Sequence, residues 1–557
     1  MSVDLSLYRL DQISGLSSLP PYTRPTCHIA GTNGKGSVSA LLSTILQSSS
    51  PPLKVGRYNS PHLLSIYDCI TINNIPVSRA SYRVASSRVT ESRLQEGTKL
   101  SSFEIMTLTA LKVFERKSVD IAIVEAGMGR RLDITNIMQD YAILVSVLTT
   151  VDLEEKFYSD DTVGKIASEK AGMARGKKPF VLGSQNPAHA QQIEASVKKV
   201  VDGVGAVLVP AITVLKRDWD ATVDGPPPES FSLLSSSSQS PPPQPVEISL
   251  PCFSSPLKAL LPLYGAHQLD NLGTALTVIN TLLTDPLLSE RVLVPHSYRN
   301  HRLPPLKNMI TPESVARGIK ETKWPGRLSF HTVHLPPSPS TPNEAPPPPF
   351  LVLADAAHNP TSAKSLGDYI THLLHQTIVS FKEVPNYHAR RRNPICINLN
   401  ITYILSLSQY PPKPPLQTLS PLFPLGIPEL DPGDIAVSTT ISVALLRFTS
   451  PEGMPRIKSV PPTKIKVIIK GLIPDADVWV VPDADADDVD SDAKVENGPK
   501  EKSESEMEKA LRWAAGKRKE NEDGDGEDRV EQANLVVLAG SLFLVADFYR
   551  FLNQLIL

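Results

Sequence analysis

Cysteine is scarce in this chain, with four among 557 residues. Cys27, Cys69, Cys252 and Cys396 lie far apart and form no CxxC pair. This pattern excludes a disulfide framework and a cysteine zinc site, and it favours a reducing compartment. The chain also lacks an apolar run near the roughly 18 residues that a membrane span needs, and MSVDLSLYRL has no signal-peptide pattern. We therefore expect a cytoplasmic protein that does not associate with membranes.

Neither sign of charge is in excess, because 56 Lys and Arg face 58 Asp and Glu. The net charge of −2 argues against a general nucleic-acid binder, whose affinity rests on excess basic charge. Proline, in contrast, is abundant, with 52 residues. Since proline is excluded from the interior of helices and strands, we expect irregular insertions at 223–257, 334–349 and 385–433. The charged stretch 482–529 is a fourth expected insertion, and EMEKALRWAAGK is an expected helix within it. Solvated spacer loops are the plainer interpretation of these insertions, and polyproline ligands for SH3-type domains are the alternative.

Short apolar runs alternate with helical patterns along the first 215 residues. The runs SVDIAIVEAGMG and YAILVSVLTTVD end in turn or polar residues, as buried parallel strands of βαβ units do. Between such runs, Phe103, Met106, Ala110 and Phe114 recur at nearly helical spacing and predict a core-facing stripe. The run FLVLADAAHNPTSAKSLGDYI again reads as strand, loop and helix. The pattern predicts an α/β fold with a second α/β unit that begins near Trp324.

A glycine-rich loop is the strongest motif, and a predicted strand precedes it while a predicted helix follows. Its residues are Gly31-Thr32-Asn33-Gly34-Lys35-Gly36-Ser37. Glycines let backbone N–H groups converge on an anion, Lys35 supplies a cation for phosphates, and Ser37 can orient Mg²⁺. The strict Walker pattern fails, because Ile29 stands at its first glycine and Gly36 follows the lysine. Taken alone, the motif could also be a simple glycine-rich turn.

Six further motifs follow this loop in a fixed order. They are NSPHL, VEAGMGRRLDITN, SEKAGM, YGAHQLDN, WPGRL and DAAHNP. Together with HIAGTNGKGS they resemble the folylpolyglutamate synthase/dihydrofolate synthase family, a branch of the Mur-ligase-like ADP-forming amide ligases. The resemblance covers residues 1–214, 258–332 and 350–380. Asn33, where eukaryotic folylpolyglutamate synthases usually have lysine, and the absence of a leader before the motif make the chain most similar to fungal dihydrofolate synthases.

This resemblance implies a fold and a reaction. The implied fold is an ATP-binding P-loop domain with a mainly parallel sheet at 1–322 and a smaller Rossmann-like domain at 323–557, with ATP between them. The implied reaction joins L-glutamate to 7,8-dihydropteroate through an acyl phosphate, uses ATP and Mg²⁺, and gives dihydrofolate, ADP and phosphate. We expect a monomer. A folylpolyglutamate synthase, a bifunctional enzyme and a catalytically degenerate nucleotide-binding homologue remain as alternatives.

The resemblance also implies a magnesium site. Its ligands would be Ser60 of NSPHL and Glu125 at the end of IAIVE, together with Ser37. Without the resemblance, Ser60 belongs to a proline-fixed turn and Glu125 to a strand end on the surface. Glu155 stands where the family has a metal-binding histidine, so it either replaces that ligand or marks a damaged site. Lys170 of SEKAGM matches a lysine that the family carbamylates, although a helical lysine is ordinarily solvated.

The remaining implied residues bind the nucleotide. Gln268 and Asn271 lie three positions apart, on one helical face, and could instead be capping or interhelix amides. Arg327 of WPGRL would reach ATP phosphate, and Asp355 and His358 of DAAHNP would contact the nucleotide. The implied catalytic residues are Lys35, Lys170 and Arg327. Two departures from the family pattern are Arg130 and Ala356, each in place of a glycine.

Overall fold

The computed structural model describes most of the chain: residues 21–95, 99–127, 129, 133–153, 162–234, 240–289, 305–338, 345–382, 395–409, 414–423, 435–481, 504–519 and 531–556. The chain divides into two compact units. The first comprises Met1–Pro227 and Pro243–Trp324, and the second comprises Pro228–Pro242 and Pro325–Leu557. The sequence-based boundary at 322/323 lies two residues before this division.

The first unit contains an eight-stranded sheet in the order β4-β3-β2-β5-β1-β6-β7-β8. Strands β2, β5, β1, β6, β7 and β8 run parallel, whereas β3 and β4 join antiparallel at one edge. The bounds are β1 Thr26–Ala30, β2 Val55–Tyr58, β3 Ile70–Ile72, β4 Ile75–Pro76, β5 Ile121–Glu125, β6 Ile143–Leu148, β7 Pro179–Leu182 and β8 Val207–Pro210. The predicted mainly parallel sheet is confirmed.

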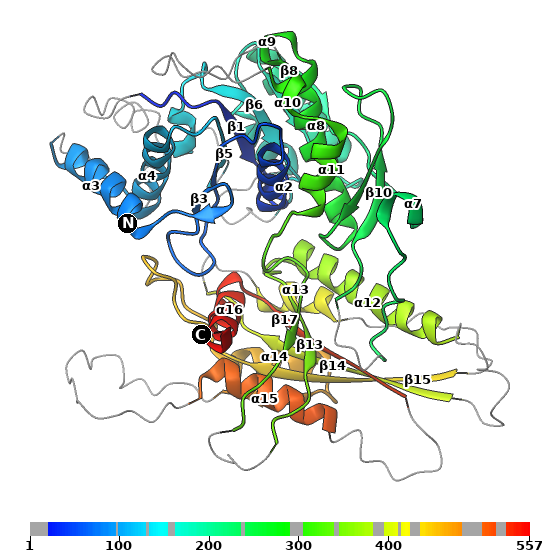
Figure 1. Ribbon diagram of the computed structural model, residues 1–557. Helices are drawn as coiled ribbons and strands as arrows, with labels where there is room; N and C mark the ends of the chain where they lie inside the picture. Colours follow the sequence, from blue (N-terminus) through cyan, green and yellow to red (C-terminus); the bar gives the residue numbers. More distant parts are fainter. Residues whose placement is uncertain are drawn as a thin grey trace. The chain divides into compact units, whose positions relative to one another are not determined.

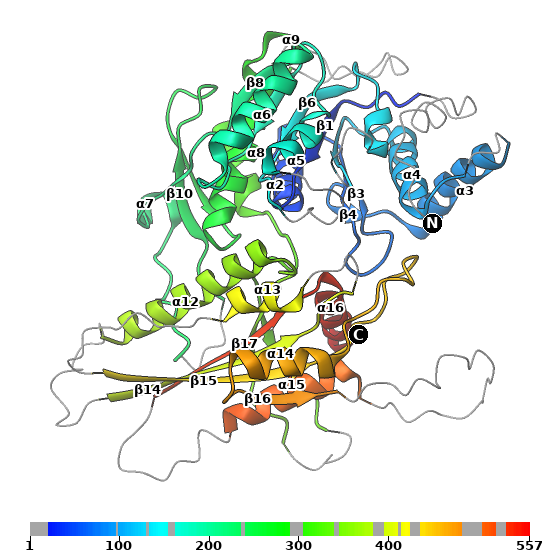
Figure 2. The same ribbon diagram turned by 180° about the vertical axis from the view of Figure 1, so that it is seen from behind.

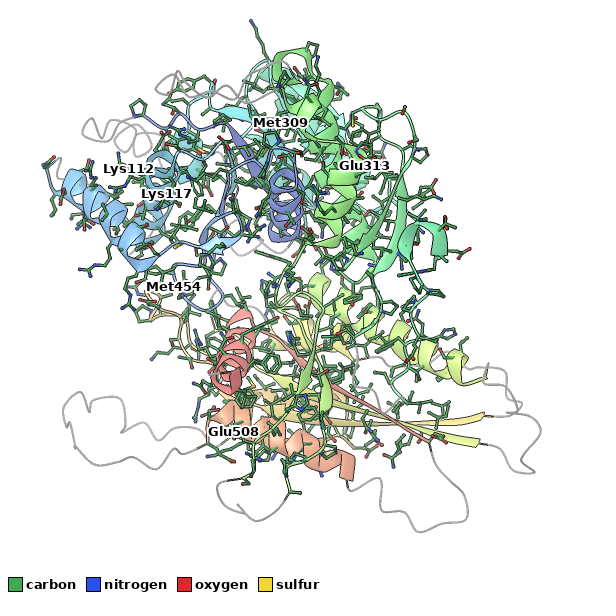
Figure 3. The ribbon with its side chains drawn as sticks, in the orientation of Figure 1. Lys112, Lys117, Met309, Glu313, Met454 and Glu508 are labelled. Carbon is green, nitrogen blue, oxygen red and sulfur yellow. The ribbon has the colours of Figure 1, made fainter. Side chains whose placement is uncertain are left out.

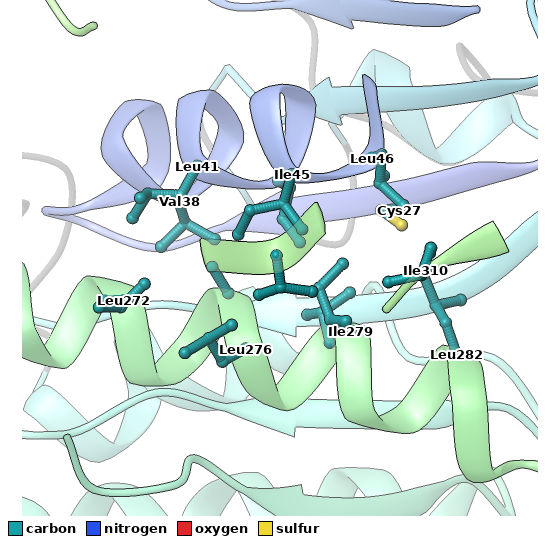
Figure 4. Packing of buried hydrophobic residues seen from close by; sticks show 14 of the residues in the cluster. Cys27, Val38, Leu41, Ile45, Leu46, Leu272, Leu276, Ile279, Leu282 and Ile310 are labelled. Atoms are coloured by element: carbon teal, nitrogen blue, oxygen red, sulfur yellow. The ribbon is translucent and has the colours of Figure 1, made fainter. Parts of the chain in front are cut away.

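Helices cover both faces of this sheet (Figures 1 and 2). Successive residues of a strand point to opposite faces, so Ile123 packs in a cluster with α2, while Val124 packs in a cluster with α4. The first cluster joins α2 to α8, where Leu41 and Leu276 lie in the same apolar layer (Figure 4). These helices are α2 Lys35–Gln47, α4 Ser102–Lys117, α8 Ala266–Thr284 and α11 Pro312–Lys320. The phosphate loop therefore leads into a helix that is fixed along its length.

Helix α4 shows why the local sequence forms this structure. Ser101 and Glu104 make a reciprocal capping box at its start, which satisfies two backbone N–H groups. Met106 and Phe114 of the predicted stripe are buried, and Lys117 stands exposed at the end of the helix (Figure 3). The predicted core-facing stripe is confirmed.

Smaller elements complete the first unit. They are α3 Arg79–Gln95, α5 Val163–Ala171, α6 Ala190–Gly203, α7 Ala221–Asp224, α9 Pro286–Ser289, α10 Leu306–Met309, and the strands β9 Leu215–Lys216, β10 Gln244–Ile248 and β11 Leu257–Leu261. The last three form an antiparallel sheet. The expected low-complexity insertion at 223–257 is therefore partly wrong, because β10 lies inside it and pairs with both neighbours.

The second unit has a six-stranded sheet in the order β12-β13-β17-β14-β15-β16. Only β12 runs antiparallel to its neighbour. The elements are β12 Ser329–Val333, β13 Phe350–Ala354, β14 Ile395–Leu405, β15 Ile435–Leu445, β16 Asp477–Val480, β17 Glu531–Ala539, α12 Pro360–Lys382, α13 Pro415–Leu419, α14 Pro462–Leu472, α15 Glu506–Lys519 and α16 Leu542–Ile556. This parallel α/β architecture is the Rossmann-like domain that the resemblance implies.

One of the expected insertions in this unit needs correction. The range 385–433 contains β14, which pairs with β15 along its whole length and with β17 from Ile397 to Leu405. The prolines around this strand made the segment resemble an insertion. The range 482–529 contains helix α15 at the expected position EMEKALRWAAGK, while 482–503 and 520–529 lie outside the described residues. None of the helices that the structure describes is both long enough and apolar enough to cross a membrane.

Candidate functional site

The candidate site lies where three neighbouring parallel strands end. Strand β1 is flanked by β5 and β6, and the backbone pairing continues past the strands. The N–H of Ala126 donates to Ile29 O at 2.8 Å, and the N–H of Thr149 donates to Ala30 O at 2.8 Å. The residues that follow these strands therefore share one edge, which is where open α/β sheets bind their ligands.

The first half of the phosphate loop is fixed by the segment after β6. The N–H of Thr32 donates to Thr150 O at 2.8 Å, and the Thr149 hydroxyl donates to Asn33 O at 2.7 Å. The Thr32 hydroxyl in turn accepts the N–H of Asp152 at 3.1 Å. These bonds occupy the loop's early polar groups, so an anion is left to the donors that follow.

Those later donors are at the start of α2. Gly34 is the N-cap and has no side chain to cap the helix, so the first-turn amides have no partner within the helix. Their N–H groups and the helix dipole favour an anion. Gly34 has φ +89°, and a Cβ there would collide with Asn271 Oδ1. Only glycine therefore fits this position without strain.

Lys35 lies within the same loop. Its Nζ donates to Gly31 O and Thr32 O at 3.0 Å each, and it lies 3.8 Å from Glu125 Oε1. Ser37, two residues on, is buried. The lysine is thus held by groups of the same site, and an incoming phosphate would compete with these carbonyl oxygens for it.

Glu125 connects the ends of β5 and β2. It is the last residue of β5 and is 5% exposed, and its Oε2 accepts a hydrogen bond from Asn59 Nδ2 at 2.7 Å. Ser60 follows Asn59 directly after β2. A carboxylate and a hydroxyl are ligands that suit a hard divalent cation, so this donor set fits Mg²⁺.

The described residues do not complete a metal site by themselves. No three His, Cys, Asp or Glu side chains among them converge where they could hold an ion. Glu155 and Arg130 lie outside the described residues. The metal role of Glu155 and the effect of Arg130 in place of a glycine therefore stay predictions.

Lys170 reaches the same region from α5. Its side chain is 1% exposed, so the alternative of a solvated lysine is wrong. A Cβ on Gly129 would lie 3.6 Å from Lys170 Nζ and 3.0 Å from Ala30 Cβ. The amine is therefore close to both the turn after β5 and the end of β1. Burying a charged amine is costly, which indicates a functional or electrostatic partner at this edge.

Gln268 and Asn271 are buried on the first turns of α8. Asn271 Nδ2 donates to Gln268 Oε1 at 3.0 Å, which confirms that the two amides share a face. Gln268 Nε2 is buried and has no hydrogen-bond partner among the described residues. A buried donor without a partner is costly, and a ligand acceptor beside Gly34 would satisfy it.

In the second unit, Arg327 lies in a tight turn that Asp355 holds. The N–H of Leu328 donates to Asp355 Oδ2 at 2.7 Å, and the N–H of Ala357 donates to Oδ1 at 2.8 Å. Leu328 has φ +46°, an uncommon conformation for a leucine. Burial raises the pKa of Asp355. One carboxylate oxygen thus braces the Arg327 turn and the other braces the loop of Asp355 itself, a role that the motif alone did not reveal.

The arginine itself and His358 are less constrained. Arg327 Nη1 donates to Gly326 O at 2.9 Å. His358 is exposed, and its Nδ1 lies 2.7 Å from Ala356 O. The structure therefore brings Arg327 and Asp355 together, while His358 stands at the surface of its loop. Ala356 is buried, and its N–H donates to Gly326 O at 2.9 Å.

Sequence reasoning missed three residues of these two regions. Asn59 bonds to Glu125, although only its neighbour Ser60 was singled out. Arg57 is a buried charged residue within the short strand β2, and an arginine among residues of a predicted buried strand could have indicated a functional role. Tyr549 of α16 accepts the N–H of Gly326 at 3.2 Å. Tyr549 lies more than two hundred positions after Gly326 in the chain, so no local sequence pattern could predict this contact.

Comparison with known proteins gives relatives along nearly the whole chain, although no family model matches it. The chain is 27% identical over 470 residues to dihydrofolate synthetase of Saccharomyces cerevisiae, which covers 84% of this chain and 87% of that protein. It is 26% identical over 554 residues to a probable dihydrofolate synthetase of Schizosaccharomyces pombe, which covers 99% of each.

Solved structures agree in fold. Folylpolyglutamate synthase of Mycobacterium tuberculosis, solved with ADP and AMPPCP, matches 98% of this chain and 95% of that chain, with a TM-score of 0.63 and 20% identity. FolC of E. coli, solved with DHPP and ADP, matches 100% and 94%, with a TM-score of 0.59 and 18% identity. The Mur-ligase-like fold is confirmed. The chain is thus similar over nearly its whole length to dihydrofolate synthetases, and in fold to folylpolyglutamate synthases.

Proposed function

We propose that this protein is a dihydrofolate synthase, which joins L-glutamate to 7,8-dihydropteroate with conversion of ATP to ADP and phosphate. The observation that carries the proposal is the similarity to a probable fungal dihydrofolate synthetase over 99% of both chains. The geometry supports it, because an anion-binding helix start, a buried carboxylate and a buried lysine meet at one edge of the sheet.

The reaction needs an activated carboxyl group, because a carboxylate is a poor electrophile. One carboxylate oxygen of dihydropteroate attacks the γ-phosphorus of ATP, the bond to the β–γ bridging oxygen breaks, and ADP leaves. The glutamate amine then attacks the acyl carbon of the resulting acyl phosphate, loses a proton and displaces phosphate. The protein's contribution is to align three reactants and to balance negative charge.

We assign separate roles in this reaction to the phosphate loop, to the amides of α8 and to the residues around Arg327. The first-turn amides of α2, from Lys35 to Ser37, hold the phosphates, and Lys35 moves from the loop carbonyls to a phosphate oxygen. Gln268 and Asn271 hold the nucleotide beside Gly34. Arg327 and His358 are proposed to contact the nucleotide, and Asp355 is proposed to act by bracing the Arg327 turn.

Glu125 and Ser60 would hold Mg²⁺ together with Ser37, and Glu155 and Lys170 are proposed at the same site. When bound, the ion neutralises phosphate charge and orients the transferred group. Support comes from a bifunctional folylpolyglutamate synthase/dihydrofolate synthase of Yersinia pestis that was solved with AMPPNP and a Mn ion. Lys170 is a cation as an unmodified amine, so carbamylation would make it compatible with a nearby metal.

Folylpolyglutamate synthesis is the second candidate. The chain is 31% identical over 189 residues to folylpolyglutamate synthase of Neurospora crassa, although this match covers only 35% of that protein. Asn33 in the phosphate loop favours the first candidate.

The test is release of ADP by the purified protein with Mg²⁺, ATP and L-glutamate, with 7,8-dihydropteroate and tetrahydrofolate as alternative acceptors. We expect turnover with dihydropteroate. Turnover with tetrahydrofolate alone would move the assignment to polyglutamylation, and turnover with both would indicate a bifunctional enzyme. Absence of turnover in folded protein that still binds ATP would contradict both activities and favour a degenerate homologue.

A further inference from the structure

Arg57 is a buried cation beside the phosphate loop with unused hydrogen-bonding capacity. It lies on β2, is 8% exposed, and its Nε makes a long hydrogen bond of 3.5 Å to Thr71 Oγ1. Its Nη1 is buried without a partner among the described residues. Burial lowers its pKa to about 10, so it stays charged at neutral pH. Such a group is costly in the folded state unless something pairs with it.

Trp324 supplies a second donor of the same kind. The Arg57 guanidinium lies over its indole ring, 4.9 Å from the centroid. Its Nε1 is also buried without a partner within the part of the chain that the structure describes. A Cβ on Gly36 would lie 3.1 Å from this Nε1 and 3.0 Å from Cε2. The indole N–H therefore lies against the first turn of α2, where glycine leaves room for it.

The neighbouring carboxylates do not use these donors. Glu125 and Asp68 are the carboxylates that raise the pKa of Arg57 by Coulombic attraction. Asp68 accepts hydrogen bonds from the backbone N–H groups of Leu63, Leu64 and Ser65, at 3.0, 2.7 and 2.9 Å. Glu125 accepts from Asn59 and faces Lys35. One charged and one neutral donor thus stay available next to the helix start.

We propose that Arg57 Nη1 and Trp324 Nε1 form an oxyanion subsite adjoining the phosphate loop. This subsite takes an anionic oxygen of the phosphoryl group in transfer or of the carboxylate that receives it. The inference rests on the proposed function, since that reaction is what brings both oxygens to the start of α2. Arg57 supplies a permanent charge for the oxygen, and the Trp324 ring fixes the plane of the guanidinium.

Three variants test this subsite by binding alone. Arg57→Met removes the charge and keeps the length, Arg57→Lys restores a charge, and Trp324→Phe keeps a ring but removes the N–H. Arg24→Met is the matched control. Arg24 is also a buried arginine whose Nη1 has no partner among the described residues, but it precedes β1 at the opposite end of the strand and pairs with Glu115 at 3.0 Å. Calorimetry with Mg²⁺ gives the dissociation constants of ADP, of AMPPNP and of dihydropteroate in the presence of ADP.

If the subsite takes the phosphoryl oxygen, Arg57→Met weakens AMPPNP binding at least tenfold more than ADP binding. If it takes the carboxylate, the ratio for the two nucleotides stays constant and dihydropteroate binding weakens at least tenfold. In either case Arg57→Lys recovers part of the loss, and Trp324→Phe shows a smaller loss of the same kind. The proposal is overturned if Arg57→Met changes neither quantity, or if Arg24→Met changes them equally.

These readouts do not depend on turnover. A wild-type protein that turns over no acceptor would therefore contradict the proposed function, while the difference between Arg57→Met and Arg24→Met would still decide the subsite.

Discussion

Replacement of Gly34 by alanine tests the phosphate loop most sharply. Alanine at φ +89° suffers a backbone penalty, and its Cβ would overlap Asn271 Oδ1. The amide of Asn271 must then move, which breaks its 3.0 Å hydrogen bond to Gln268 Oε1. The mutation therefore strains the loop and disrupts the pair of amides that we assign to the nucleotide.

The magnitude follows from these two effects. The left-handed conformation costs alanine about 1–2 kcal/mol, and the lost hydrogen bond costs about 1 kcal/mol. If the loop of Gly34→Ala relaxes into another conformation in the free protein, phosphate binding must return it to the strained conformation of the wild type. The combined cost of about 2–3 kcal/mol then appears as weaker ADP binding by roughly 30- to 150-fold.

Gly205→Ala is the matched control for this experiment. Gly205 has φ +69°, and a Cβ there would meet nothing within 4 Å, so the variant carries the backbone penalty without a collision near the site. We expect it to be less stable by about 1–2 kcal/mol and to bind ADP as the wild type does. Calorimetric titration with ADP measures both variants. ADP binding by Gly34→Ala within about threefold of wild type would refute the reasoning.

Three further predictions concern charge, pH and positioning. Glu125→Gln keeps a side-chain oxygen that can accept from Asn59 but loses the negative charge. Titration with Mn²⁺ in the presence of ADP, followed by electron paramagnetic resonance, should show metal binding that is more than about tenfold weaker. Unchanged metal binding would remove Glu125 from the metal site. Burial and Arg175 lower the pKa of His28 to about 3. At acidic pH the unfolded chain therefore binds a proton that the native state does not bind. The free energy of unfolding falls as the pH drops below about 6.5, by about 2 kcal/mol at pH 5. Urea unfolding should show His28→Gln losing less stability than wild type between pH 7 and pH 5, and equal losses would contradict the assignment. Tyr549→Phe removes one acceptor of the Gly326 N–H. The lost hydrogen bond costs about 1 kcal/mol and, by loosening the Arg327 turn, should lower kcat about fivefold to tenfold while ADP affinity stays unchanged. A kcat equal to that of the wild type would make Tyr549 a packing residue only.

Local patterns predicted the parts of this protein that local physics determines. The apolar runs became β5 and β6, and the glycine loop entered α2 as expected. Ser101 and Glu104 fix the start of α4 by a short-range capping box. Such features depend on neighbours within a few residues, so the sequence contains all the information they need.

Features built from distant segments could not be predicted in this way. Strand β14 was taken for an insertion because prolines flank it, whereas its pairing with β15 and β17 decides its structure. The bracing of the Arg327 turn by Asp355 and Tyr549 joins elements far apart in the chain. The burial of Lys170 likewise depends on how α5 packs rather than on the neighbouring residues in the sequence.

Transfer of an oxygen isotope tests the central claim most directly. Dihydropteroate labelled with ¹⁸O in its carboxylate is incubated with the protein, Mg²⁺, ATP and L-glutamate, and the phosphate and the pterin product are analysed by mass spectrometry. The account predicts dihydrofolate as the product and one ¹⁸O atom in each phosphate released, because the carboxylate oxygen attacks the γ-phosphorus. Dihydrofolate formed with unlabelled phosphate would contradict the acyl phosphate, and phosphate release without dihydrofolate would contradict the proposed ligation.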